Sequence, residues 1–405
     1  MTDPAVASAG AASNSRLAPS RLAILFEFPT LNGGERSMLA ALDALRRLSD
    51  GGQDRPLDFL AMAPAAGPLA TALTAAGIAH IPFECRDQAG KRRASEELLL
   101  ELDSLVRAQG IELLHANSLS MARLTGAAAV RLPIPTTGHL RDMVRLSAAA
   151  VADLNRNRRL IAVSHATRQF HVGQGVASDR ITTLYNGVDL ERFAPRPMTG
   201  WLKRELRLPV EAFLIATIGQ IGLRKGQDTL AAAAALIGPV TPQAHFLIIG
   251  ERYSEKDESV DYERRIFESF HSAGLTDRVH RLGYRHDMER VLSEIDLIVH
   301  PARQEPLGRV LLEAAACGKP IVATDVGGTS EILRDGADAR LVAPGMPRQL
   351  ADAVLELIRN RSLRTTYGAA ARRAVEERFE IGIASWKLKA FWLEILSKFA
   401  GSAAN

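Results

Sequence analysis

Short apolar runs alternate with longer helical patterns along most of the chain. Between residues 21 and 195, the runs RLAILFEF, LDFLAM, IELLHAN, PIPTTGH and RLIAVS are separated by stretches whose apolar residues recur at helical spacing. Strands that are apolar on both faces and joined through helices are typical of a parallel sheet covered on both sides. The pattern therefore predicts a doubly wound, Rossmann-like α/β domain over residues 21–195.

The pattern restarts after the Pro/Arg-rich stretch ERFAPRPMTG. The runs AFLIATIG, AHFLIIG, RVHRLG, DLIVHP and KPIVAT predict a second Rossmann-like domain over residues 196–380. Ligands of such folds bind outside the carboxyl ends of the strands, so we expect the two domains to face each other across a cleft. A C-terminal helix at 381–400 carries Trp386, Phe391 and Trp392 and is predicted to cross back to the first domain. A helix that stays in one core is equally compatible with this pattern.

Composition is that of a globular protein, with 405 residues, 47% hydrophobic and 24% charged. The net charge of +4 is too small to indicate a nucleic-acid-binding protein. The Ala/Ser-rich residues 1–20 lack the apolar core of a signal peptide and are predicted to be a disordered tail. Cys85 and Cys317 lie far apart and outside any CxxC pair, which favours a reducing, cytoplasmic location.

Arginine is concentrated between Met121 and Arg168. This segment holds eight arginines (123, 131, 141, 145, 156, 158, 159 and 168) and two acids. One interpretation is a solvated helix face, and the other is a basic surface that meets an anionic membrane or an acidic acceptor. No run approaches the ~18 apolar residues of a spanning helix, so any membrane contact is expected to be peripheral, on the inner face.

The stretch HPARQEPLGRVLLEAAACGKP places two glutamates around an apolar run. A buried strand is predicted to end at His300 and a helix to end at Gly318, so residues 305–308 form a turn at the carboxyl edge of the sheet. Main-chain N–H groups at a helix start favour phosphate; those expected to be free belong to Leu307, Gly308, Arg309 and Val310.

Carboxylates at both ends of this run can accept hydrogen bonds from hydroxyl groups. Glu305 precedes the free N–H groups, and Glu313 follows near two helical turns later on a similar face. The spacing suits one extended sugar nucleotide. The competing interpretation is that Arg309 and Glu313, four residues apart, merely pair on the surface.

A second turn, LIATIGQIGLRKGQDTL, supports a phosphate ligand. A strand is followed by a loop with Arg224 and Lys225 and by a helix that opens after Gly226. Cations in such a loop can neutralise a diphosphate, although the loop could also only cap a neighbouring helix. Gly219 and Gly222 do not complete the GxGxxG fingerprint of dinucleotide binding.

Several stretches together resemble one family. GQIGLRKG, EPLGRVLLEAAACGKPIVATDVGG, LYNGVDLERF, AVSHAT and LNGGERSML are similar to the retaining glycosyltransferases of family four, which have the two-domain B-type fold. The similarity covers about residues 21–399. It implies transfer of a sugar from a nucleotide-sugar donor to a hydroxyl of a glycan, lipid-linked or small-molecule acceptor, in cell-envelope or polysaccharide biosynthesis.

The resemblance also implies roles for individual residues. Glu305 would bind the hydroxyls of the transferred sugar, Glu313 the ribose, the main chain of residues 307–310 the sugar and diphosphate, and Lys225 the diphosphate. His139, in TTGH, matches a histidine beside the reacting sugar, and its competing interpretation is a satisfied histidine at a strand end. His139, Lys225 and Glu305 are therefore the catalytic candidates.

Two loop positions complete the implied donor site. Gly33 and Gly34 match a glycine pair whose backbone approaches the donor phosphates or the acceptor. Gln220 stands where the family usually has an arginine. Arg224 and Arg309 are candidates to replace that charge; otherwise phosphate binding would be weaker or activity lost.

No Asp-x-Asp motif, which holds a metal in many other glycosyltransferases, occurs in the chain. The helix start and the cations would then stabilise the charge of the diphosphate in place of a metal, so neither an obligatory metal nor a cofactor is expected. Two other functions remain open, a sugar-nucleotide epimerase of the same fold and an inactive sugar-nucleotide-binding protein. A periplasmic binding protein is disfavoured by the missing signal peptide.

Overall fold

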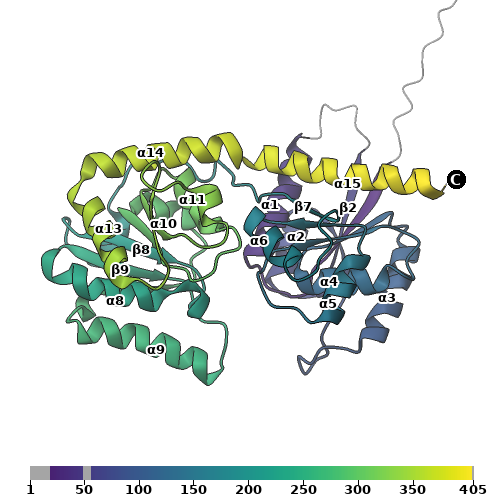
Figure 1. The fold of residues 1–405 in the computed structure, drawn as a ribbon, viewed down its shortest axis with the longest axis horizontal. Helices are drawn as coiled ribbons and strands as arrows, with labels where there is room; N and C mark the ends of the chain where they lie inside the picture. Colours follow the sequence, from purple (N-terminus) through teal and green to yellow (C-terminus); the bar gives the residue numbers. More distant parts are fainter. Residues whose placement is uncertain (1–18, 49–55, 404–405) are drawn as a thin grey trace, which may run out of the picture.

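The computed structural model describes residues 19–48 and 56–403 and consists of two α/β lobes that lie side by side (Figure 1). The first lobe contains a seven-stranded parallel sheet with the order β3-β2-β1-β4-β5-β6-β7. Its strands are β1 (Ser20–Leu25), β2 (Leu57–Ala63), β3 (Ala79–Pro82), β4 (Leu113–Ala116), β5 (Thr136–Leu140), β6 (Arg159–Ala162) and β7 (Ile181–Thr183). Its helices are α1 (Gly33–Leu48), α2 (Pro68–Ala75), α3 (Ser95–Ala108), α4 (Leu119–Ala128), α5 (Ala148–Arg156) and α6 (His165–Val172).

The second lobe contains a six-stranded parallel sheet with the order β10-β9-β8-β11-β12-β13. Its strands are β8 (Phe213–Ile218), β9 (Ala244–Ile249), β10 (Val279–Gly283), β11 (Leu297–His300), β12 (Ile321–Thr324) and β13 (Arg340–Val342). Its α-helices are α7 (Trp201–Glu205), α8 (Gln227–Ile237), α9 (Asp257–Ser272), α10 (Met288–Glu294), α11 (Arg309–Ala316), α12 (Thr329–Ile332), α13 (Pro347–Arg359) and α14 (Arg361–Arg378). The predicted fold of two doubly wound domains is confirmed.

Both sheets are buried on both faces, as the continuous apolar strands predict. Each lobe has an apolar cluster on either side of its sheet, and β4, β8, β11 and β12 are almost entirely inaccessible to solvent. Helix starts are set locally: the hydroxyls of Ser118, Ser147 and Ser164 each accept a hydrogen bond from the main-chain N–H three residues on, and thereby begin α4, α5 and α6.

The C-terminal helix α15 (Ile381–Ala403) crosses back to the first lobe, as one of the two interpretations of its pattern predicts (Figure 1). Leu388, Phe391 and Trp392 pack into the apolar cluster formed with β1, β2 and α1. Trp392 is fully buried, and its indole N–H donates to Nδ1 of His115 over 3.2 Å. Trp386, in contrast, remains 41% exposed. The helix therefore completes the core of the first lobe.

The carboxyl ends of the two sheets face each other. Gln304, after β11, donates its amide N–H to the carbonyl of Met143, after β5, over 2.8 Å. The hydroxyls of Ser164 and Thr167, after β6, donate to the carbonyl of Pro306. These contacts place the loops that follow β5 and β6 directly against the turn that carries Glu305.

Three local predictions from the sequence differ from the structure. Gly33 and Gly34 form the first turn of α1 and not a separate loop, since the carbonyl of Asn32 already accepts a helical hydrogen bond from the N–H of Arg36. Of the tail expected over 1–20, residues 1–18 lie outside the described residues and Ser20 belongs to β1. Strands β3, β7 and β13 were not predicted; all three are short edge strands of three or four residues.

Candidate active site

The carboxylate of Glu305 is the centre of the candidate site in the second lobe. It lies in the turn between β11 and α11, is 5% exposed, and accepts hydrogen bonds from Lys225 Nζ and, over 2.9 Å, from His300 Nε2. Burial by itself raises the pKa of Glu305, but the Lys225 ammonium and the hydrogen bond from His300 outweigh it and lower that pKa well below its ordinary value. The carboxylate is therefore ionised and held in one orientation.

His300 supports this arrangement as a neutral imidazole. Burial lowers its pKa, and the nearby Lys225 lowers it further, although the bond to Glu305 acts in the opposite direction. Since a carboxylate can only accept, the ring carries its proton on Nε2 and donates it to Glu305.

The main chain after Glu305 offers free donors. Within the described residues, none of the N–H groups of residues 307–310 donates a hydrogen bond to another protein group. Gly308 has a φ of 105° and precedes α11, so this position favours glycine. The positive end of α11 and its free N–H groups together form an anion-binding geometry.

A glycine pair after β12 braces the same turn. The N–H of Gly328 donates to the carbonyl of Glu305 over 2.9 Å, and a Cβ on Gly327 would lie 2.0 Å from that oxygen. The close approach therefore requires glycine and keeps the backbone of the turn fixed.

Glu313 lies on α11, where Arg309 Nη2 is 3.3 Å from Glu313 Oε1. The pair expected from the i, i+4 spacing exists, but Glu313 is only 5% exposed, so it is not a surface pair. Leu307, at 2% exposure, packs its side chain into the core and contributes only main-chain atoms to the site. Val310 is half-buried against the same cluster.

The basic loop after β8 supplies one cation to this site. Residues Leu223–Lys225 form a short 3-10 turn, Gly226 ends it at a φ of 66°, and Lys225 reaches Glu305. Arg224 is exposed, and its carbonyl accepts from the N–H of Arg303 over 2.8 Å. Gln220 is exposed as well, and its carbonyl accepts from Gln227.

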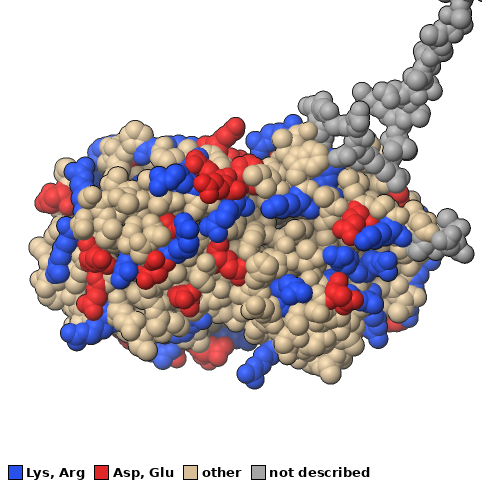
Figure 2. Space-filling view, turned by 45° about the horizontal axis from the view of Figure 1, so that its top comes forward, with Lys and Arg blue, Asp and Glu red and all other residues tan. Residues whose placement is uncertain are grey.

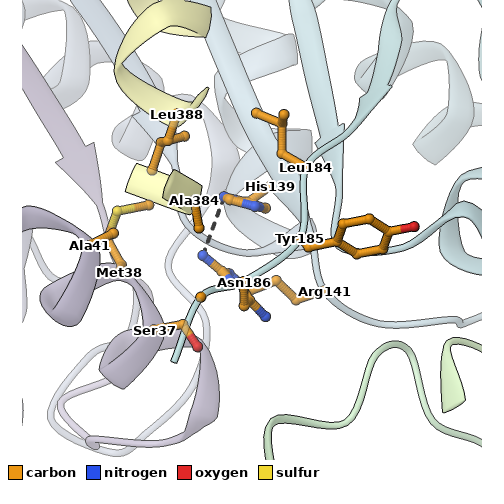
Figure 3. Close-up of a pocket in the computed structure, with 11 residues that line it drawn as sticks. Ser37, Met38, Ala41, His139, Arg141, Leu184, Tyr185, Asn186, Ala384 and Leu388 are labelled. Carbon is orange, nitrogen blue, oxygen red and sulfur yellow. Dashed lines mark hydrogen bonds between the residues drawn. The ribbon is translucent and has the colours of Figure 1, made fainter. Parts of the chain in front are cut away.

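His139 lies at the end of β5 in the first lobe and lines a pocket with residues of α1, α15 and the segment after β7 (Figure 3). It is 4% exposed, and its Nδ1 lies 3.2 Å from Nη2 of Arg141, the contact drawn as a dashed line. The pocket encloses about 20 Å³, which is room for about one water molecule. Burial lowers the pKa of His139 far below its ordinary value, so the ring is neutral.

The glycine pair of the first lobe lies beside this pocket. A Cβ on Gly34 would lie 3.1 Å from Cδ of Arg141, whereas one on Gly33 would meet nothing within 4 Å. The first turn of α1 can therefore approach the end of β5 closely at Gly34 only.

The structure thus brings Lys225 and Glu305 into contact, joins Arg309 to Glu313, and places His139 on the opposite lobe. Sequence reasoning did not single out His300, Asn117 or Arg141. All three are polar residues at or just after the carboxyl end of an apolar strand, and that position in the printed sequence is the signal that could have identified them.

The arginines between residues 121 and 168 do not gather into one patch. Arg131 pairs with Glu96, Arg156 with Asp153 and Arg159 with Glu394, while Arg168 donates to main-chain carbonyls. On the face shown in Figure 2, basic and acidic side chains are interspersed over both lobes.

Within residues 19–48 and 56–403, no group of three or more His, Cys, Asp and Glu residues is placed to hold a metal ion. Over the same residues, no helix has the length and apolarity that crossing a bilayer requires. Both cysteines are buried and unpaired.

Comparison with known proteins defines the class. Residues 32–192 match the model of Glycosyltransferase Family 4, and residues 202–374 match that of Glycosyl transferases group 1. The two models occur in the order of the two lobes and together account for most of the chain. The chain therefore belongs to the family 4 glycosyltransferases with the two-domain B-type fold.

Individual relatives match parts of the chain or its fold. D-inositol 3-phosphate glycosyltransferase of Salinispora arenicola is 31% identical over 202 residues, 48% of this chain and 45% of that protein. N-acetyl-alpha-D-glucosaminyl L-malate synthase of Bacillus anthracis is 29% identical over 200 residues, 49% of this chain and 50% of that protein. The chain thus spans about half the length of the curated relatives it matches.

Solved structures share the whole fold at low identity. Anabaena HepE in complex with UDP has a TM-score of 0.79 and 23% identity, with 93% of this chain and all of that chain covered. Sucrose-phosphate synthase from Thermosynechococcus elongatus has a TM-score of 0.76 and 18% identity, with 94% and 100% covered. These likenesses establish the two-lobed architecture.

Proposed function

We propose that this protein transfers a hexose-like sugar from a nucleotide-sugar donor to a hydroxyl group, with retention at the anomeric carbon. The observation that carries the proposal is the Glu305 turn. An ionised carboxylate, held by Lys225 and His300, lies directly before four main-chain N–H groups at the start of α11 that have no partner within the described residues. Such a turn offers acceptors for sugar hydroxyls and donors for a diphosphate within one short segment.

The donor would lie along this turn. The N–H groups of residues 307–310 and the Lys225 ammonium would bind the diphosphate, Glu305 the sugar hydroxyls and Glu313 the ribose. Lys225 has three N–H donors, so it can bind a phosphate oxygen without releasing Glu305.

Transfer would proceed on one face of the sugar. The bond between the anomeric carbon and the diphosphate oxygen breaks, the acceptor oxygen forms the new bond, and the leaving diphosphate takes the acceptor's proton. The N–H groups at the start of α11 and Lys225 stabilise the charge that develops on the diphosphate. His139 would position the sugar from the first lobe.

A thermal-shift panel of sugar nucleotides tests the donor site. A ligand at 100 times its Kd stabilises the folded state by about 2.7 kcal/mol, so the best donor should raise the melting temperature clearly. Glu305→Ala and Glu313→Ala should each remove most of that shift. Arg123→Ala, on the exposed side of α4, serves as the control and should keep it. Full shifts in both glutamate variants would rule out this donor site.

An inactive sugar-nucleotide-binding protein is the second candidate function, and the exposed, uncharged Gln220 favours it. Donor binding with no transfer to any of a broad panel of hydroxyl acceptors would support that candidate. Formation of an epimeric sugar nucleotide without an acceptor would instead support the epimerase.

For the acceptor, we propose a hydroxyl of a glycan, a lipid-linked sugar or a small molecule in cell-envelope or polysaccharide biosynthesis. A peripheral contact through the basic segment around Arg145 and Arg158 would accompany a lipid-linked acceptor, because these two arginines make no ion pair within the described residues. Flotation with vesicles of anionic lipid, with and without added salt, measures that contact. Transfer that survives a chelator would agree with the absence of an obligatory metal.

A further inference from the structure

The guanidinium of Arg141 is held by neutral groups only. Its Nε donates to the carbonyl of Asn117 over 3.0 Å, Nη2 to Oδ1 of the same residue over 2.9 Å, and Nη1 to Oδ1 of Asn186 over 2.8 Å. No carboxylate forms an ion pair with it among the residues that the structure describes. Burial lowers the pKa of Arg141 to about 10, so the side chain stays charged near neutral pH. The carboxylates of Glu35 and Asp142 oppose this lowering of the Arg141 pKa from a distance, but neither lies within ion-pair distance of the guanidinium.

The contact with Arg141 also sets the protonation of His139. Arginine can only donate, so Nδ1 of His139 accepts from Nη2, and the single proton of the neutral ring is on Nε2. That Nε2 atom is buried and has no hydrogen-bond partner among the described residues. A buried N–H without a partner costs free energy unless a ligand accepts from it.

Asn117 also has a buried N–H donor without a partner. It is 1% exposed, its Oδ1 accepts from Arg141, and its Nδ2 has no hydrogen-bond partner within the described part of the chain. Among the described residues, one cluster therefore contains a guanidinium without an ion-paired carboxylate and two buried donors without a partner. Donors of this kind are the groups that bind oxyanions in proteins.

The position of the cluster in the sheet is that of a ligand site. Asn117 follows β4, and His139 and Arg141 are at the end of β5. The strand order reverses between β1 and β4, and Gly34, in the helix after β1, allows the backbone to lie against Arg141. Ligands of doubly wound sheets bind at such a reversal.

This reversal faces the turn of Glu305. Met143 is two residues beyond Arg141 and accepts from the side chain of Gln304, the neighbour of Glu305. The cluster on the first lobe and the donor turn on the second lobe therefore open toward the same space between the sheets.

We propose that Asn117, His139 and Arg141 form an oxyanion-binding subsite on the first lobe that holds a phosphate group during transfer. The phosphate belongs either to the donor diphosphate, where Arg141 supplies the cation that position 220 lacks, or to an anionic acceptor. The proposal rests on the proposed function for its role in transfer, but the binding of phosphate can be tested by itself.

Calorimetric titration of the full-length protein with inorganic pyrophosphate and inorganic phosphate, at constant ionic strength, tests the subsite. Arg141→Gln should weaken binding of at least one probe by about tenfold or more, since hydrogen bonds to charged groups contribute about 1.5–3 kcal/mol. Arg123→Gln, on the exposed side of α4, should bind within twofold of the unaltered protein. No measurable binding of either probe by the unaltered protein, or equal affinity in Arg141→Gln, overturns the proposal.

Asn117→Asp tests whether the cluster binds phosphate or only stabilises the fold. The new carboxylate would pair with Arg141 and repel phosphate, so the melting temperature should stay equal or rise while phosphate affinity falls at least tenfold. A variant that unfolds more easily yet still binds phosphate normally would indicate a structural role only and would overturn the proposal.

Saturation with UDP distinguishes the two sources of the phosphate. If UDP abolishes the Arg141-dependent binding of inorganic phosphate, the donor diphosphate occupies the subsite. If one equivalent of phosphate still binds in an Arg141-dependent manner, the subsite is for the acceptor. Failure of every sugar nucleotide to bind would refute the proposed function and leave the phosphate titration as an independent test.

Discussion

On the second lobe, Lys225 and Arg309 each contact a buried carboxylate, whereas on the first lobe Arg141 donates to asparagine oxygens and a histidine nitrogen. In the second lobe the charges balance before any ligand arrives, and the free groups are main-chain N–H groups at a helix start. In the first lobe, no carboxylate of the described residues lies within ion-pair distance of the Arg141 guanidinium. The difference agrees with the two proposals, that the turn on the second lobe binds the donor sugar and its diphosphate and that the cluster on the first lobe binds an anion.

Glu305→Gln should have the largest effect, because it removes the carboxylate that pairs with Lys225. Removing one partner of a buried ion pair costs about 3 kcal/mol, and transfer should fall at least about 100-fold with the loss of an oriented charge. Chemical unfolding and initial rates measure the two effects. Glu356→Gln removes the exposed partner of Arg340 and should cost at most about 0.5 kcal/mol. Equal losses of unfolding free energy in both variants would contradict the expected difference between the buried and the exposed ion pair.

Lowering the pH should destabilise both lobes through their buried histidines before it protonates Glu305. Burial lowers the pKa of His115 to about 3 from the ordinary 6.5, so the unfolded chain binds its proton first and stability falls as the pH drops below about 6.5. At pH 5 this histidine alone costs about 2 kcal/mol; His139 and His300 add to the same loss. The depressed pKa of Glu305 preserves its contribution until the pH falls below about 4.5.

His115→Gln measures this histidine's share. The difference in unfolding free energy between pH 7 and pH 5 should shrink by about 2 kcal/mol in the variant. An unchanged difference would mean that another group carries the pH dependence.

Trp392→Phe should have a smaller effect that is confined to the first lobe. It removes the hydrogen bond to His115 and a little apolar volume, which together cost about 1 to 2 kcal/mol. The thermal shift caused by the best sugar nucleotide should remain, since Trp392 packs into the core of the first lobe and the Glu305 turn belongs to the second. If that shift disappears along with the stability, the two regions are coupled more strongly than their contacts imply.

Gln220→Arg should have the smallest effect on stability, within about 0.5 kcal/mol, because the residue is exposed. It adds a cation on the second lobe, so it should raise affinity for UDP a few-fold and restore part of the binding lost in Arg141→Gln. Titration of UDP into the single and double variants measures the restoration. No gain in the double variant would place Arg141 on the acceptor side of the reaction.

Much of the fold could be predicted from the strand pattern. Ten of the thirteen strands in the described residues coincide with predicted runs, most of them apolar and buried on both faces, for example LIVH at β11 and FLIATI at β8. The missed strands β3, β7 and β13 lie at sheet edges, where half-exposed residues such as those of AHIP leave no continuous apolar run. Edge strands take their structure from the neighbouring strand, and their own sequence signals it weakly.

The candidate donor site, like the fold, could be predicted from the sequence only in part. By itself, the sequence determined the turn between β11 and α11, because a buried strand, a glycine with positive φ and an apolar helix succeed one another within about twenty residues. Only the tertiary structure decided that His300 and Lys225 share Glu305 and that Arg141 lacks a carboxylate. Pattern and propensity act over a few residues, whereas the charge balance of a buried group depends on side chains that packing brings together from distant elements.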